Sequence, residues 1–229
     1  MMMPGAYLIA LIFMLIGWAV QMQLRRKFKE YSEIPLAAGL TGKEVAEKML
    51  RAHQITDVQV MSVEGQLTDH YNPVKKTLNL SPAVYNGNNA AAAAVAAHEC
   101  GHAVQHATAY AWLQLRSALV PVVSVTSNIV QWVLIAGILF INVFPNLLLI
   151  GIIMFATVTL FSLITLPVEF DASRRGLAWL ESSGITSSLE HNKAKDALWW
   201  AAMTYVVNAL AAITTLLYYL MIYMGRRRN

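Results

Sequence analysis

Four long apolar runs decide what this chain can fold into. They cover residues 4–20, 118–140, 147–166 and 198–224, and a helix needs about 20 apolar residues to cross a bilayer. Across the chain 57% of residues are hydrophobic and only 13% are charged, whereas soluble domains carry about 25% charged residues. The sequence therefore predicts an integral membrane protein that is mainly α-helical, with about four transmembrane helices.

The polar stretches between these runs divide the chain into five predicted parts. The N-terminal transmembrane anchor is expected to be retained, because it has no Ala-x-Ala cleavage site and its basic cluster follows the apolar run. The five parts are the anchor at 1–23, an α+β region at 24–116, two transmembrane helices at 117–167, a helix and loop with a candidate metal ligand at 168–197, and a C-terminal transmembrane helix with a basic tail at 198–229.

The α+β region is predicted to contain a helix followed by a small sheet. Thr41 and Glu44 have the spacing of a capping box, which predicts a helix over 41–53. Short alternating segments bounded by turn residues then predict an antiparallel sheet. These segments lie at 57–63, 66–71 and 76–81.

An alanine-rich helix, predicted from about Asn89 to Trp112, carries the pattern HExxH in the form of His98, Glu99 and His102. Successive residues of a helix are about 100° apart, so the two histidines lie about 40° apart on one face. Their ring nitrogens can converge on one zinc ion. The adjacent Glu99 can act as general base on a water molecule that the ion activates, and later pass the proton to the leaving amine.

HExxH alone is short enough to occur by chance in an alanine-rich helix, so its surroundings matter. Gly101 lies inside the predicted helix, where glycine costs about 1 kcal/mol relative to alanine. We therefore expect another element to pack closely at this position. The place of the motif between a sheet and a membrane span also favours a functional site.

A catalytic zinc site usually takes a third protein ligand and keeps a fourth position open. His106 is the nearest candidate, but it lies two turns from His98 and is rotated by about 80°, so three histidines do not easily share one ion on a straight helix. The metzincin pattern is excluded, because Gln105 and Thr108 stand where it requires glycine and histidine. Glu169, at the end of the third apolar run, is the better candidate.

Pro167 is expected to open the helix that carries this glutamate, with Glu169 and Asp171 in its first turn. Acidic residues there also stabilise a helix dipole without any catalytic role. Arg174 follows on the same helix. It either stabilises the oxyanion of the reaction or sets the orientation beside the lipid headgroups, and the second interpretation is the favoured one.

The predicted sheet adds candidates for contact with the substrate. His70 and Tyr71 end a predicted strand, and they either face the cleft and donate to the oxyanion or are ordinary surface residues. Together with Asp171, Arg174 and His106, His70 completes the set of candidates for support of the ligands or of the oxyanion. A strand of the 57–81 region is expected to pair with an extended substrate.

Residues 67–180 resemble a known family. The stretches "LTDHYNP", "AAHECGHAVQH" and "PVEFDASRRGL" are similar to those of the bacterial membrane zinc metallopeptidases of the YugP type. The resemblance implies a zincin-like region with the zinc ligands His98, His102 and Glu169, and with Glu99 as the catalytic residue.

The HtpX-type gluzincins, to which this family is more distantly similar, pair HExxH with a downstream ExxxD. Counted from Glu169, the aspartate of that pattern falls at Ser173 in this chain. Its supporting role toward a zinc-binding histidine is therefore expected to be either moved to Asp171 or lost.

The sequence thus predicts a membrane-embedded, zinc-dependent endopeptidase that cuts unfolded or membrane polypeptides. The alternative is a zinc-binding membrane protein without hydrolase activity, such as a sensor or an assembly factor. A transporter is disfavoured, because the second and third apolar runs contain no Asp, Glu, His, Lys or Arg. Nucleic acid is not an expected partner, since the basic residues cluster beside the apolar runs, where they meet the lipid bilayer.

Basic residues near the ends of the apolar runs predict the orientation, because Lys and Arg favour the cytoplasmic side. The clusters at 25–29 and 173–175 place the HExxH helix and Glu169 inside, and the uncharged loop at 141–146 fits the outside. We expect a protein of the bacterial inner (cell) membrane with its site facing the cytoplasm. Four full crossings would leave the tail at 225–229 outside, so either the fourth run does not cross fully or the first loops dominate.

Overall fold

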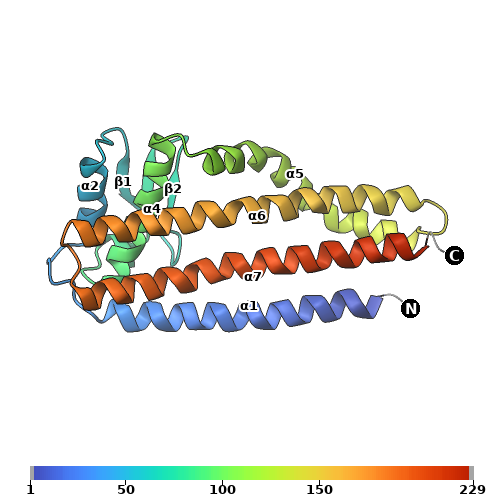
Figure 1. Ribbon diagram of the computed structural model, residues 1–229, viewed down its shortest axis with the longest axis horizontal. Helices are drawn as coiled ribbons and strands as arrows, with labels where there is room; N and C mark the ends of the chain where they lie inside the picture. Colours follow the sequence, from blue (N-terminus) through green and yellow to red (C-terminus); the bar gives the residue numbers. More distant parts are fainter. Residues whose placement is uncertain (1–2, 227–229) are drawn as a thin grey trace. The chain divides into compact units, whose positions relative to one another are not determined.

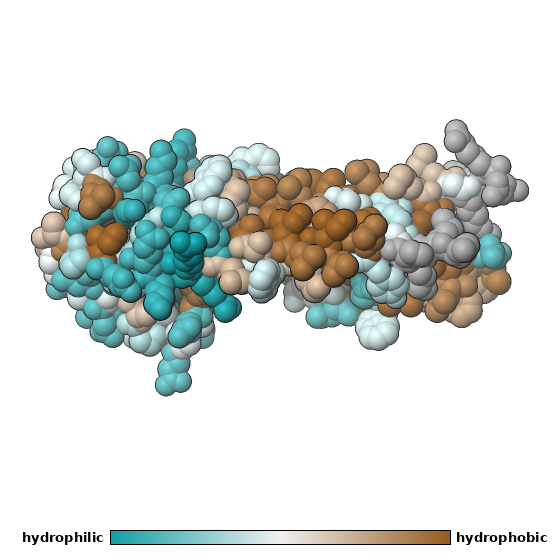
Figure 2. Space-filling model, turned by 90° about the horizontal axis from the view of Figure 1, so that it is seen from below, coloured by the Kyte–Doolittle hydropathy of each residue, from teal (hydrophilic) through white to brown (hydrophobic). Residues whose placement is uncertain are grey.

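The computed structural model describes residues 3–226 and is mainly helical (Figure 1). Within this part of the chain, four helices are long and apolar enough to cross a membrane. Only 6–28% of the residues in their apolar windows are buried, and hydrophobic residues form much of the surface of the long helices (Figure 2). The predicted mainly helical fold, with four candidate membrane-spanning helices, is confirmed. These helices are α1 (Met3–Ser32), α5 (Ala111–Leu139), α6 (Pro145–Ser182) and α7 (Ser188–Arg226).

The chain divides into two compact units, of which one contains every candidate site residue. This unit, called the site unit below, consists of Val20–Gln114 and Pro167–Met203. Besides segments of the long helices it holds α2 (Gly42–Ala52), α3 (Pro82–Tyr85), α4 (Ala90–Ala107) and a three-stranded sheet. The capping box at the start of α2 is confirmed, since the Thr41 hydroxyl accepts from the Glu44 N–H and the Glu44 carboxylate accepts from the Thr41 N–H.

The sheet is mixed and not antiparallel throughout, which corrects the prediction. Its order is β1 (Gln59–Ser62), β3 (Thr77–Leu80), β2 (His70–Asn72), with β1 parallel and β2 antiparallel to β3. Leu78 and Leu80 of β3 are fully buried in the core of the site unit, whereas β1 is largely exposed. The most apolar strand therefore takes the central position, although it comes last in the sequence.

The helix that carries HExxH ends earlier than predicted. Instead of continuing to Trp112, α4 ends at Ala107 and α5 begins at Ala111. The Thr108 hydroxyl donates to the Val104 carbonyl at 2.8 Å, and Ala109 adopts a positive φ of 53°. A left-handed residue of this kind ends a helix, so the motif helix and the second span are separate elements.

Helix α6 corrects a third prediction. Pro167 does not open a new helix but lies inside α6, which continues from Pro145 to Ser182. Proline is tolerated within membrane helices, because neighbouring helices, side chains or local adjustments of the backbone satisfy the groups that it frees. Glu169 is therefore carried by the same continuous helix that forms the third span.

Helices α4 and α6 approach each other at two glycines. A Cβ on Gly101 of α4 would lie 2.4 Å from the Ala172 carbonyl oxygen, and a Cβ on Gly176 of α6 would lie 2.7 Å from the Ala97 carbonyl oxygen. The close packing expected at Gly101 is confirmed. Because both neighbours are backbone atoms, neither contact has room for a side chain.

We expect Gly101→Ala and Gly176→Ala each to lower the free energy of unfolding by about 1–3 kcal/mol, because an added methyl group forces the two helices apart. Gly17→Ala is the matched control, since a Cβ there meets nothing within 4 Å. Thermal unfolding of the detergent-purified variants, followed by circular dichroism, measures the difference. Equal stability of Gly101→Ala and Gly17→Ala would contradict the close crossing.

Candidate metal centre

The site unit brings His98, His102 and Glu169 together. The two histidines lie one turn apart on α4, with ring centroids 4.8 Å apart in an edge-on arrangement. Glu169 reaches them from α6, and its Oε2 lies 3.4 Å from Nε2 of His98 and 3.6 Å from Nε2 of His102. One potential ligand atom from each of the three residues lies within 4.8 Å of the others.

These distances fit a zinc ion. Ligand atoms at about 2.0–2.1 Å from a tetrahedral zinc are about 3.3–3.4 Å apart, which is close to the observed separations of 3.4 and 3.6 Å between Glu169 and the two histidines. Two imidazoles and one carboxylate also form a donor set that zinc accepts while keeping a fourth position open. The separations between Glu169 and the two histidines are therefore compatible with one shared zinc ion.

Burial makes the interactions within this group strong. Glu169 is 3% exposed, and Glu99 and His102 are each 8% exposed. Burial lowers the pKa of His102, but the hydrogen bond and the charge of Glu169 raise it more, so the pKa lies above its usual value. The carboxylate of Glu169 thus attracts a positive charge to the Nε2 atoms that face it.

The outer nitrogens of the two histidines have different partners. Nδ1 of His98 is hydrogen-bonded to the Ser173 hydroxyl at 3.0 Å, and Nδ1 of His102 to Oε1 of Gln105 at 3.0 Å. A supporting role was expected either to move to Asp171 or to be lost, and Asp171 is linked to His102 through Gln105 and not directly. Ser173 itself contacts His98, and Asp171 accepts a hydrogen bond of 2.9 Å from Gln105.

Gln105 is the residue that sequence reasoning missed. In the sequence it indicates only that the metzincin pattern is absent. In the structure it is fully buried and joins His102 to α6. Its position three residues after a candidate ligand, on the same face of the helix, is the signal that could have pointed to it.

Glu99 is held by the sheet. Its Oε2 accepts a hydrogen bond of 3.0 Å from the backbone N–H of Tyr71 in β2. The Tyr71 hydroxyl is hydrogen-bonded to Nδ1 of His106 at 2.8 Å, so His106 faces the tyrosine and is not part of the three-residue group. This contact places β2 directly beside the centre of α4.

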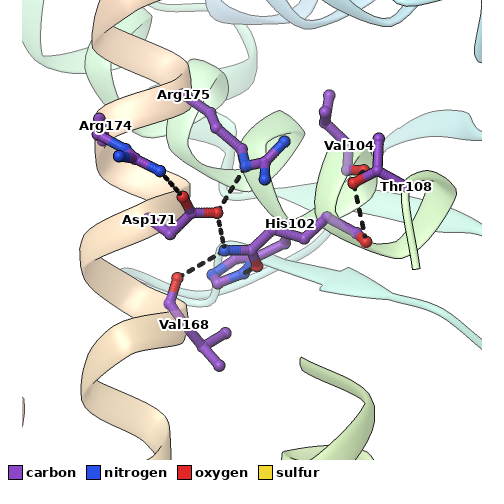
Figure 3. Close-up of polar contacts among 8 residues, drawn as sticks. His102, Val104, Thr108, Val168, Asp171, Arg174 and Arg175 are labelled. Carbon is purple, nitrogen blue, oxygen red and sulfur yellow. Dashed lines mark hydrogen bonds and ion pairs between the residues drawn. The ribbon is translucent and has the colours of Figure 1, made fainter. Parts of the chain in front are cut away.

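Two other candidates lie away from the three-residue group. His70 is exposed and is hydrogen-bonded to the Thr68 carbonyl and to Asn79. The side chain of Arg174 is 77% exposed and, like Arg175, pairs with the Asp171 carboxylate, as Figure 3 shows. Cys100 is fully buried, and burial raises the pKa of its thiol well above the usual value.

Comparison with known proteins shows the family of the chain. The family model described as "Putative neutral zinc metallopeptidase" matches residues 6–224. A protein of Bacillus subtilis (strain 168) named "Putative membrane protease YugP" is 40% identical over 213 residues, which cover 93% of this chain and 93% of that protein. No solved structure matches the chain. The predicted zinc metallopeptidase, with zinc as its cofactor, is confirmed at the level of the family.

Proposed function

The chain belongs to the family of neutral zinc metallopeptidases, and we propose that it hydrolyses peptide bonds at a zinc site held by His98, His102 and Glu169. The observation that carries this proposal is the convergence of their three potential ligand atoms within 4.8 Å. Two histidines from HExxH and a glutamate from a second helix make this a gluzincin-type site in a zincin-like region.

Glu99 is the general base and acid of the proposed reaction. When bound, zinc polarises the scissile carbonyl and makes a water molecule more acidic. Glu99 takes the proton from this water as it attacks and returns it to the leaving amine. The hydrogen bond from the Tyr71 N–H holds one carboxylate oxygen and leaves Oε1 to exchange the proton.

The substrate in this proposal is an extended segment of an unfolded or membrane polypeptide. β2 is an edge strand of the sheet, and its Tyr71 N–H points away from β3 and toward Glu99. An extended peptide that adds to this edge has its backbone beside the general base. β2 is therefore the best candidate for the substrate-pairing strand.

The proposed orientation places the site at the cytoplasmic face of a bacterial cell membrane. The basis is the basic residues within the site unit near the ends of the apolar runs, since Lys and Arg near the ends of spans favour the cytoplasm. These residues are Arg25, Arg26, Lys27, Lys29, Arg174 and Arg175.

The proposed role of Glu99 is tested by Glu99→Gln, which keeps the size of the side chain but cannot accept the proton. We expect this variant to cut an unstructured protein such as casein at least about 100-fold more slowly than wild type, while binding as much zinc. Glu47→Gln is the matched control, because Glu47 is on the exposed face of α2 with Lys43 as its ion-pair partner. Cleavage rates and the zinc content of each purified protein are the two measurements.

Two results would count against the proposal. Cleavage by Glu99→Gln at the wild-type rate would show that another group acts as the base. A wild-type protein that holds zinc but cuts neither soluble nor membrane-inserted polypeptides would favour the sensor or assembly factor instead.

Zinc removal is expected to loosen α4 from α6, because one ion would bridge the two helices. A ligand present at 100 times its Kd stabilises the folded state by about 2.7 kcal/mol, so a chelator should lower the Tm of wild type by several degrees. In Glu169→Ala, which lacks the bridging carboxylate, the same chelator should change the Tm little. Equal shifts for the two proteins would place the ion elsewhere.

A further inference from the structure

The buried side-chain amide of Gln105 is hydrogen-bonded to three different groups. It is fully buried, and its Nε2 donates to the Val168 carbonyl at 2.8 Å and to Oδ2 of Asp171 at 2.9 Å. Its Oε1 lies 3.0 Å from Nδ1 of His102. A buried polar network in which every member is satisfied fixes the positions of its members.

The partners of the amide determine which way it faces. A carbonyl and a carboxylate can only accept hydrogen bonds, so the amide nitrogen of Gln105 must face Val168 and Asp171, and its oxygen must face His102. The oxygen can only accept, and His102 therefore carries its proton on Nδ1. This tautomer keeps the lone pair of Nε2 for a metal ion, on the side of the ring that faces Glu169.

The carboxylate of Asp171 anchors the network from α6. Arg174 and Arg175 both pair with it, as Figure 3 shows, and the guanidinium of Arg175 lies over the ring of Tyr110, 5.5 Å from its centroid. The Asp171 carboxylate accepts hydrogen bonds from Gln105, Arg174 and Arg175, and not from either candidate metal-binding histidine. Among the hydrogen bonds of the site, Gln105 is the link between this carboxylate and His102.

On this basis, and resting on the proposed zinc site, we propose that Gln105 is a positioning residue which transmits the charge of Asp171 to His102 and fixes His102 as an Nε2 ligand. His98 is supported differently, because its Nδ1 meets the neutral hydroxyl of Ser173. The two histidine ligands therefore differ in their outer partners, and the hydrogen bonds of His102 lead through Gln105 to a carboxylate.

Zinc affinity tests this inference in the full-length, detergent-purified protein. Loss of an outer partner of a metal ligand typically weakens binding about 10–100-fold, and we expect that loss in Gln105→Leu. Gln105→Met has nearly the same length but cannot form the hydrogen bonds to His102, Val168 and Asp171, so it should weaken binding as well. Competition with a chromophoric chelator gives each Kd, and the visible spectrum of the cobalt-substituted protein reports the ligand geometry directly.

Ser81→Ala is the control for a loss of stability alone. Ser81 is a buried residue of the site unit whose hydroxyl donates to Asp69 at 3.1 Å, and it shares no hydrogen bond with the Gln105 network. It should lower the Tm of the metal-free protein while leaving the zinc Kd within about twofold of wild type. Wild-type affinity and an unchanged cobalt spectrum in both Gln105 variants would overturn the inference.

A double-mutant cycle separates transmission through the amide from general damage. If Asp171 acts only through Gln105, Asp171→Ala should weaken zinc binding about tenfold in the wild-type background and change it less than twofold in the Gln105→Leu background. Additive effects would mean that the two residues act independently and would overturn the inference. Because the readout is metal affinity, this result is independent of whether the protein cuts the polypeptides tested for the proposed function.

Discussion

The close crossing of α4 and α6 is the constraint on which the rest of the site depends. Gly101 and Gly176 let the two backbones touch, and only at this distance does the Glu169 carboxylate lie between the two histidines. Burying a carboxylate in this way is costly unless opposite charge compensates it. Imidazole protons or a metal ion can supply that charge. The contact between the two helices therefore determines both their packing and the chemistry of the site.

Much of this arrangement could be predicted from local signals. The four apolar runs predicted the membrane-spanning helices, because the number of apolar residues that a helix needs to cross is set by the thickness of the bilayer. The capping box at Thr41 and the spacing of His98 and His102 were also informative, since each depends on contacts within one helix. Glu169 was identified because the end of the third span had to lie on the same side of the membrane as HExxH.

The remaining features depend on tertiary contacts that no local pattern encodes. Proline is common at the first position of a helix, yet Pro167 lies inside α6. The positive φ of Ala109 separates α4 from α5. The contact of Tyr71 with Glu99 follows from the order of the strands, which the alternating pattern does not determine. The hydrogen bond between Gln105 and Asp171 joins two helices that are far apart in the sequence, so the sequence alone did not predict it.

The most direct test of the account is X-ray absorption at the zinc edge of the purified, catalytically competent protein. The proposed site predicts one zinc with nitrogen and oxygen neighbours at about 2.0–2.1 Å and the outer-shell scattering of two imidazoles. A sulfur neighbour at about 2.3 Å, which only Cys100 or a methionine could supply, would contradict it. So would the scattering of three imidazoles, because the third ligand would then be a histidine in place of Glu169.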